Sequence, residues 1–331
     1  MADPKRVLVT GGAGFIGRWV VKAFLADTRA RVYVLDDFSN GVKENLAEFS
    51  GEPRLAGVKK GRIQSAKTVE DFVGKVKPDL CVHLAAQIIV QDSIDDPGGT
   101  FESDVRGTFN LLEACRAAGS RFAFMSTCMV YDLAAAKSGI TELHPVLPRS
   151  PYAGAKLAGE HLAISYYHAY GMPVTVMRPF NTYGPHQKAT GEGGVVSIFV
   201  SKQLRGEELR IYGTGRQTRD LLFVGDCADF VMRAGMSRAA EGRVLNASTG
   251  EDISINALAR LVVDSAPGKT GSKIKRVKHI HPQSEIMKLC GDCAAAKKLL
   301  GWKPRVPLKK GIGLTRDWLS DLMERGDTTW Q

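Results

Sequence analysis

The chain has 331 residues, of which 44% are hydrophobic and 24% charged, a balance typical of a soluble globular protein with one large α/β unit or two modest domains. The formal net charge of +10 comes from dispersed Lys and Arg residues with no basic run interleaved with aromatics, which argues against nucleic-acid binding and fits an anionic small ligand. No apolar run approaches a membrane span, and the first expected strand begins too early to leave room for a signal peptide. Since the six cysteines are scattered, we expect reduced thiols and a cytoplasmic location.

Strand-like and helix-like segments alternate from the start of the chain. The clearest expected strands are 7–9, 31–35, 80–84, 121–126 and 174–178, and the helices between them are 19–26, 107–118 and 155–170. This alternation predicts an α/β fold of the Rossmann type, a doubly wound parallel sheet with helices on both faces. Beyond 178 the pattern loosens, and Gly, Pro and polar residues crowd 181–194. Later elements are expected at 221–236, 243–246, 254–266, 292–302 and 308–322.

A glycine-rich turn follows the first expected strand. Gly12, Gly14 and Gly17 have the spacing whose glycines permit a tight turn, admit a pyrophosphate and pack helix against strand. The next expected strand ends in Asp36-Asp37, nineteen positions after Gly17. A carboxylate there accepts a hydrogen bond from a ribose 2′-hydroxyl and repels a 2′-phosphate, so the turn predicts a dinucleotide site that favours NAD over NADP.

The expected site divides the chain into two parts. We predict that residues 1–180, joined by about 221–248, form an NAD-binding Rossmann domain. Residues 181–220 and 249–331 are expected to form a smaller, discontinuous C-terminal substrate-binding lobe. Because ligands of open α/β sheets bind outside the carboxyl ends of the strands, the reactive site should lie between these parts.

Tyr152 and Lys156 form a second motif. They are four positions apart and so share one face of a helix. An ammonium beside a phenol favours the phenolate and lowers the tyrosine pKa from its ordinary value of about 10, which would make Tyr152 a base near neutrality. Alone, such a pair is usually a surface pair. Beside a dinucleotide fingerprint it indicates catalysis.

With these motifs the chain resembles an extended short-chain dehydrogenase/reductase of the nucleotide-sugar epimerase and dehydratase branch, of the UDP-glucose 4-epimerase type. The resemblance runs essentially end to end. It rests also on the runs His83-Leu84-Ala85-Ala86-Gln87, Ser126-Thr127, Arg178-Pro179-Phe180-Asn181-Thr182-Tyr183-Gly184-Pro185, Arg219-Asp220 and Leu299-Leu300-Gly301-Trp302-Lys303-Pro304.

The resemblance implies NAD as cofactor and a nucleotide-diphosphate sugar as substrate. It implies that Tyr152 takes a proton from a sugar hydroxyl, that Lys156 holds the nicotinamide ribose, and that Thr127 binds the same hydroxyl while NAD⁺ takes the hydride. Asn181 and Arg219 match contacts to the diphosphate, and His281 stands near an arginine that has this role in relatives. The alternative for Arg219 is a plain ion pair with Asp220. The cofactor contacts implied are Gly11, Gly14, Phe15, Ile16, Gly17, Asp36, Asp37, Ser39, Asn40, Gly41, Leu84, Ala85, Ala86, Gln87, Asp104, Tyr152, Lys156 and Pro179.

Departures from the family pattern bear on the reaction. Dehydratases that act across the 4,6 positions carry Asp-Glu directly after the threonine, whereas this chain has Cys128 and Met129. Methionine is no base, and a thiol with an ordinary pKa of about 8.5 is a poor acid. We therefore favour 4-epimerisation through a keto sugar, on a UDP-hexose or UDP-N-acetylhexosamine. A dehydratase (4,6- or 5,6-elimination) that uses Cys128 as acid stays open, as does Cys128 as a small apolar filler and the whole chain as a non-catalytic dinucleotide sensor.

Three further positions are notable. Arg62 replaces an aspartate common in relatives and could attract a 2′-phosphate, and Asp104 stands where asparagine is common. Cys290 and Cys293, with two histidines nearby, lack a second cysteine pair, so we predict no metal site. Helices 107–118 and 155–170 carry apolar residues on more than one face, and the resemblance implies a homodimer through a four-helix interface.

Overall fold

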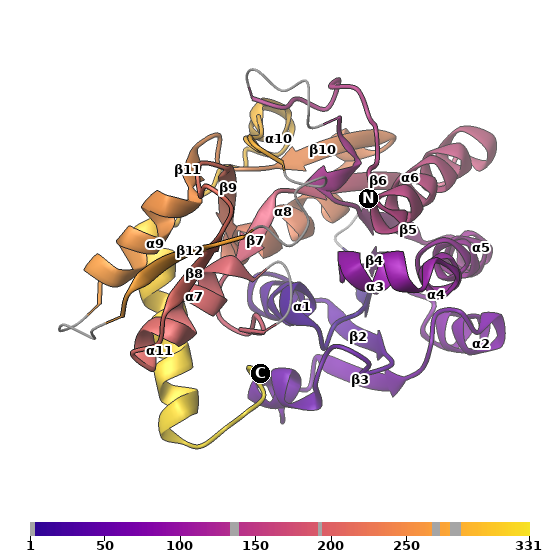
Figure 1. Ribbon diagram of the computed structural model, residues 1–331. Coiled ribbons are helices and arrows are strands. Elements are labelled where there is room, and N and C mark those ends of the chain that lie inside the picture. Colours follow the sequence, from indigo (N-terminus) through magenta and orange to yellow (C-terminus); the bar gives the residue numbers. More distant parts are fainter. Residues whose placement is uncertain (1–3, 133–138, 191–193, 267–271, 279–285) are drawn as a thin grey trace.

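The computed structural model describes residues 4–132, 139–190, 194–266, 272–278 and 286–331, and its centre is a parallel sheet of seven strands (Figure 1). The strand order is β10-β6-β5-β4-β1-β2-β3. The order reverses between β1 and β4, which opens a crevice at their carboxyl ends. The doubly wound Rossmann-type fold predicted from the sequence is confirmed. The strands are Arg6–Thr10 (β1), Arg31–Asp36 (β2), Leu55–Lys60 (β3), Leu80–His83 (β4), Arg121–Met125 (β5), Val174–Pro179 (β6) and Arg243–Ala247 (β10).

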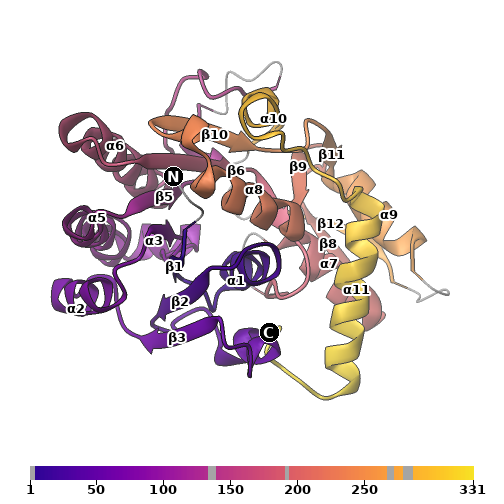
Figure 2. The same cartoon turned by 180° about the vertical axis from the view of Figure 1, so that it is seen from behind.

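Helices cover both faces of this sheet (Figure 2). One apolar cluster joins it to α1, α8 and α10, and a second joins its other face to α2, α5 and α6. Val7, Leu8 and Val9 are all fully buried, because a parallel strand between two helical layers has no solvent side. The helices are Phe15–Asp27 (α1), Ala66–Val76 (α2), Gly107–Ala118 (α5), Pro151–Tyr170 (α6), Val224–Met236 (α8) and Ala294–Leu300 (α10).

Local signals set the bounds of α6, the helix that carries Tyr152 and Lys156. Ser150 precedes it, and its hydroxyl accepts the Ala153 N–H at 3.2 Å. Pro151 occupies the first turn, where its missing N–H leaves no bond unmade. Gly171 ends the helix at φ +64°, a conformation that glycine adopts without steric cost. The sequence therefore fixes the start of α6 just before the two catalytic candidates.

A second group of elements packs around its own apolar cluster. Figure 1 shows α7, α9, α11, β8 and β12 together at the left of the molecule. Within the described residues, β7, β9 and β11 form a three-stranded sheet, and β8 pairs with β12. The domain boundaries given above stay a prediction. These elements are Asn181–Tyr183 (β7), Val195–Leu204 (α7), Leu209–Tyr212 (β8), Thr218–Phe223 (β9), Asp252–Ser254 (β11), Ile255–Asp264 (α9), Ile274–Val277 (β12) and Leu308–Glu324 (α11).

Several elements were not expected from the sequence. Strand β3 lies at an edge of the main sheet and is largely exposed, so it lacks the apolar run that marks its neighbours. The short helical segments are Lys43–Phe49 (η1), Val90–Asp95 (α3), Pro97–Thr100 (α4), Phe101–Arg106 (η2), Cys128–Val130 (η3) and Arg238–Ala240 (η4). Among the described residues, no helix is both long and apolar enough to cross a bilayer.

Candidate active site

A cavity of about 390 Å³ lies at the carboxyl ends of the parallel strands. Its lining includes the residues that follow β1, β2, β4, β5 and β6, namely Gly11, Asp37, Leu84, Ser126 and Phe180. This is the crevice in which open α/β sheets bind their ligands.

The glycine-rich turn forms one wall of the cavity. Gly11 has φ +70°, and a Cβ on Gly17 would lie only 1.9 Å from the Gly11 carbonyl oxygen, so neither position tolerates a side chain. Gly14 precedes α1 without a side-chain cap, and the first turn holds no acidic residue. The N–H groups at this helix end are therefore available to an anion, and the helix dipole favours negative charge there.

Asp36 pins this turn in place. Its carboxylate accepts the N–H of Ala13 at 2.9 Å and the N–H of Phe38 at 2.8 Å. Burial raises the pKa of Asp36 above its ordinary value, partly offset by these two bonds. Carboxylate oxygens accept more than one hydrogen bond, so Asp36 can also receive a ribose hydroxyl. The bare helix end and this carboxylate together fit a dinucleotide.

Arg62 lies outside the cavity lining and 77% of its side chain is exposed. Its guanidinium is 3.9 Å from the Asp37 carboxylate. Asp37 also accepts the Ser39 N–H at 2.9 Å and the Ser39 hydroxyl at 2.6 Å. Any anion that approaches Arg62 therefore meets a neighbouring carboxylate, which weakens the case for a 2′-phosphate there.

Tyr152, Thr127 and Lys156 all line the cavity. Thr127 Oγ1 accepts the Met129 N–H at 3.2 Å. The Lys156 ammonium donates to the Met125 carbonyl at 3.1 Å and lies 5.3 Å from the centre of the Phe124 ring.

The expectation that Lys156 lowers the pKa of Tyr152 is wrong for this structure. Burial raises the pKa of Tyr152, the charge of Asp104 raises it further, and Lys156 is not among the groups that shift it. Burial lowers the pKa of Lys156 itself. The spacing of the two residues correctly predicts a shared helix face. The Lys156 ammonium, however, donates its hydrogen bond to the Met125 carbonyl.

Most of the predicted cofactor contacts line the cavity. Those that do so are Gly11, Gly14, Phe15, Ile16, Asp36, Asp37, Ser39, Asn40, Gly41, Leu84, Ala85, Ala86, Tyr152, Lys156 and Pro179. Gly17, Gln87 and Asp104 do not. Ser103, the residue before Asp104, does line it and was missed in the sequence. Both lie in η2, a π-helical segment whose wider turn alters which side chains face a neighbour.

Cys128 lines the cavity beside Thr127 and is 3% exposed. Burial, helped by the charge of Asp220, raises the pKa of the Cys128 thiol to about 12. The side chain is therefore a neutral thiol at physiological pH. Met129 lines the same cavity.

Asp220 and Arg219 do not form the plain ion pair considered above. The Asp220 carboxylate accepts the Thr249 hydroxyl at 2.7 Å and the N–H groups of Thr249, Gly250 and Gly291 at 2.8, 3.0 and 3.1 Å. Arg219 donates to the carbonyls of Thr218 and Ile286 at 2.8 and 2.7 Å.

The predicted substrate contacts are only partly brought together. Arg219 does not line the cavity, although its charge reaches Cys128. Asn181 lines it with a buried side-chain oxygen that has no hydrogen-bond partner. His281 lies outside the described residues. Within the part of the chain that the structure describes, no cluster of His, Cys, Asp and Glu could hold a metal ion.

Comparison with known proteins agrees with this geometry. The chain matches the GDP-mannose 4,6 dehydratase family over residues 8–315. It belongs to the extended short-chain dehydrogenases/reductases that include nucleotide-sugar epimerases and dehydratases. The resemblance inferred from the motifs is confirmed.

Three similar proteins illustrate the range of this family. Pal from Bacillus thuringiensis is 52% identical in sequence, with a TM-score of 0.91 over 96% of this chain and 99% of its own. The UDP-glucose 4-epimerase of Mycolicibacterium smegmatis is 36% identical over 94% of this chain and 97% of its own. DesIV, the dTDP-glucose 4,6-dehydratase of Streptomyces venezuelae crystallised with NAD, is 28% identical, with a TM-score of 0.88 over 98% of this chain and 100% of its own. The prediction of NAD as cofactor is confirmed.

Proposed function

We propose that this protein is an NAD-dependent nucleotide-sugar 4-epimerase that acts through a transient 4-keto sugar, on a UDP-hexose or UDP-N-acetylhexosamine. The observation that carries the proposal is the meeting of Tyr152, Thr127 and Lys156 in a cavity whose next two positions are Cys128 and Met129. The first three suit oxidation of a sugar hydroxyl, and the last two lack the carboxyl groups expected for 4,6-elimination. The similarity to a UDP-glucose 4-epimerase supports a UDP-sugar.

In this proposal Thr127 and Tyr152 bind the 4-hydroxyl of the sugar, and Tyr152 takes its proton. NAD, when bound, would supply reversible hydride transfer at that carbon; Tyr152 would give its proton back to the oxygen when the hydride returns to the opposite face of the keto sugar. Because burial keeps Tyr152 protonated, it needs a nearby positive charge to become a base. We expect the oxidised cofactor to bring that charge, while Lys156 holds the ribose.

The buried side-chain oxygen of Asn181 is suited to receive a donor from the substrate, because an unsatisfied acceptor at this depth costs about 1–3 kcal/mol. Asn181 begins β7, two positions after the end of β6, and lines the cavity. We therefore assign Asn181 to the substrate.

A second candidate is a dehydratase. It is favoured by Cys128, whose thiol lines the cavity and is protonated because burial raises its pKa to about 12. Such a group could protonate a leaving hydroxyl, although weakly, and the base would have to come from another residue.

Product analysis distinguishes the two. The protein is incubated with NAD⁺ and a panel of UDP-, GDP-, CDP- and dTDP-sugars, and the products are examined by mass spectrometry and NMR. An isomer of unchanged mass supports the epimerase, and loss of one water supports the dehydratase. If no sugar nucleotide is altered, both proposals fail.

A further inference from the structure

A stretch of chain after β7, within the second group of elements, borders the cavity described above. His186, Gln187, Lys188 and Thr190, together with Thr329, contribute to the lining of the cavity. The wall that faces them is formed by Gly41, Val42 and Asn45, next to the glycine-rich turn. We call residues 185–190 the strap.

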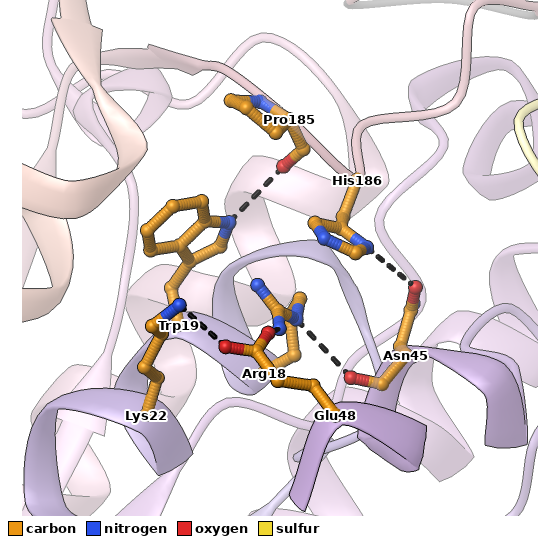
Figure 3. A network of polar contacts seen from close by, with 7 residues as sticks. All are labelled: Arg18, Trp19, Lys22, Asn45, Glu48, Pro185 and His186. Carbon is orange, nitrogen blue, oxygen red and sulfur yellow. Dashed lines mark hydrogen bonds and ion pairs between the residues drawn. The ribbon is translucent and has the colours of Figure 1, made fainter. Parts of the chain in front are cut away.

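One amide side chain ties the strap to the phosphate-binding turn (Figure 3). Asn45 Nδ2 donates to the Ala13 carbonyl at 2.8 Å, which leaves Oδ1 as the acceptor. The His186 ring therefore donates from Nδ1 to Asn45 Oδ1 at 3.1 Å. A second tie runs from α1, where Trp19 Nε1 donates to the Pro185 carbonyl at 3.0 Å.

The anchor on the cofactor side is itself held firmly. Arg18 is 1% exposed, donates from Nε to the Asn45 carbonyl at 3.1 Å and pairs with Glu48. Lys22 pairs with the other Glu48 oxygen, as Figure 3 shows. The guanidinium of Arg18 also lies 5.4 Å from the centre of the Phe49 ring. These contacts hold Asn45 in place.

His186 adopts a conformation that needs such support. Its φ of +72° lies in the left-handed region, which costs energy for a residue with a Cβ and persists only where the surroundings compensate. Its ring packs against Trp318 of α11, with ring centres 5.0 Å apart. Burial, together with the charge of Arg18, lowers the pKa of His186 to about 3. The ring is neutral at physiological pH, so the tie does not depend on protonation there.

Residues 327–331 hold the strap from the other side. The Trp330 carbonyl accepts the Ala189 N–H at 2.7 Å. The Trp330 ring is anchored, because the residue is 5% exposed, donates from Nε1 to the Asp327 carbonyl at 2.8 Å and has the Arg205 guanidinium 5.3 Å from its centre. The strap is thus tied at Pro185, His186 and Ala189.

We propose that the strap retains the bound dinucleotide, with the contact between His186 and Asn45 as its latch. The purpose rests on the proposed function: epimerisation returns to the sugar the hydride it removed, so there is no net redox change and the same cofactor molecule must stay in place. The ties run to the turn that would hold the pyrophosphate. Opening them is therefore expected to speed release of the cofactor.

The test measures release of NADH from the full-length protein without any sugar. Fluorescence of bound NADH is followed in a stopped-flow instrument after a chase with excess NAD⁺. His186→Gly removes the latch and suits the left-handed backbone, so it should fold. Loss of one hydrogen bond predicts a dissociation rate about fivefold higher or more.

The matched control is Asn256→Ala. Asn256 donates from Nδ2 to the Thr214 carbonyl at 3.0 Å and does not line the cavity. Its release rate should equal that of the unaltered protein. Trp330→Ala, which loosens the strap from its other side, should also release NADH faster.

An unchanged release rate in a folded His186→Gly protein would overturn the proposal. The release measurement does not depend on the reaction. Faster release with no sugar product would support the role of the strap and reject the proposed function. A normal isomer product with an unaltered release rate would support the proposed function and reject the role of the strap.

Discussion

Asp104 and Gln87 are joined by a hydrogen bond that leaves half of a buried carboxylate unsatisfied. Oδ1 of Asp104 accepts the Gln87 N–H at 2.7 Å, whereas the buried Oδ2 has no partner. The residue is 1% exposed, and burial raises its pKa. Its charge acts on both Tyr152 and Lys156. An acidic residue therefore influences the catalytic pair from behind the cavity wall.

Asp104→Asn should shift the pH dependence of catalysis. Besides burial, the charge of Asp104 raises the pKa of Tyr152. Removing the Asp104 charge should lower the pKa of Tyr152, so the phenolate forms at lower pH. The rate profile with pH should move toward acid, as measured by kcat from pH 6 to 10. An unmoved profile would show that Asp104 is only structural.

The same substitution bears on stability. A buried acid whose pKa is raised in the folded state favours folding below its unfolded pKa and opposes it increasingly as pH rises through its folded pKa. Asn keeps the acceptor for Gln87 and has no charge to bury. We expect Asp104→Asn to unfold at higher denaturant concentration than the unaltered protein at pH 7, with the difference diminishing toward pH 4.

Tyr152→Phe should abolish turnover and leave cofactor binding unchanged. The substitution removes the phenolic hydroxyl and leaves the ring. Loss of a positioned acid or base typically costs 10²–10⁴-fold in rate. Calorimetric titration with NAD⁺ should give a Kd close to that of the unaltered protein, since the substitution leaves the glycine-rich turn and Asp36 unchanged. Substantial activity in this variant would reject the role of Tyr152 as base.

Cys128→Ser distinguishes the two candidate reactions. If the protein is an epimerase, the rate should fall less than about tenfold, because no step moves a proton through the thiol. A dehydratase that uses Cys128 as acid should lose about 10²-fold or more. Burying a hydroxyl among Tyr131, Ile140 and Phe180 is also expected to destabilise the fold by about 1–3 kcal/mol. Thermal unfolding is therefore measured alongside the rate, so that a loss of folded protein is not taken for a loss of acid.

Local patterns predicted the features of this site that depend on a few consecutive residues. The glycine-rich turn, Asp36 and the shared helix face of Tyr152 and Lys156 belong to this kind, because helix and strand periods fix them. The direction of the Lys156 ammonium toward Met125 could not be predicted, since it depends on a carbonyl of strand β5, which is distant in the sequence from α6. The ties from Asn45 to His186 and from Ala189 to Trp330 join distant parts of the chain, and no local pattern encodes them.

Asp220→Ala should destabilise the second group of elements. Its carboxylate accepts four hydrogen bonds, from Thr249, Gly250 and Gly291, and so ties β9 to two other segments. Removing it leaves buried donors without an acceptor, which predicts a loss of about 3 kcal/mol in the free energy of unfolding. The control is Asp252→Ala, an exposed aspartate on the neighbouring β11. Chemical denaturation of both variants measures the difference, and equal midpoints would contradict the assigned role.

The homodimer expected through α5 and α6 can be tested by a substitution that introduces one charge. The two helices pack side by side, and their outer surface exposes Phe109 and Tyr170 by 44% and 58%. Phe101, at the start of η2, is 50% exposed. A four-helix interface would bury such side chains, so Phe109→Arg should convert a dimer into a monomer in light scattering coupled to gel filtration, because an unpaired charge is costly in an apolar contact. Ile274→Arg, on the exposed strand β12, changes a side chain of similar exposure, 39%, far from these helices and should leave the mass unchanged. A monomeric unaltered protein would exclude this interface. A dimer that survives Phe109→Arg and dissociates with Ile274→Arg would place the interface elsewhere.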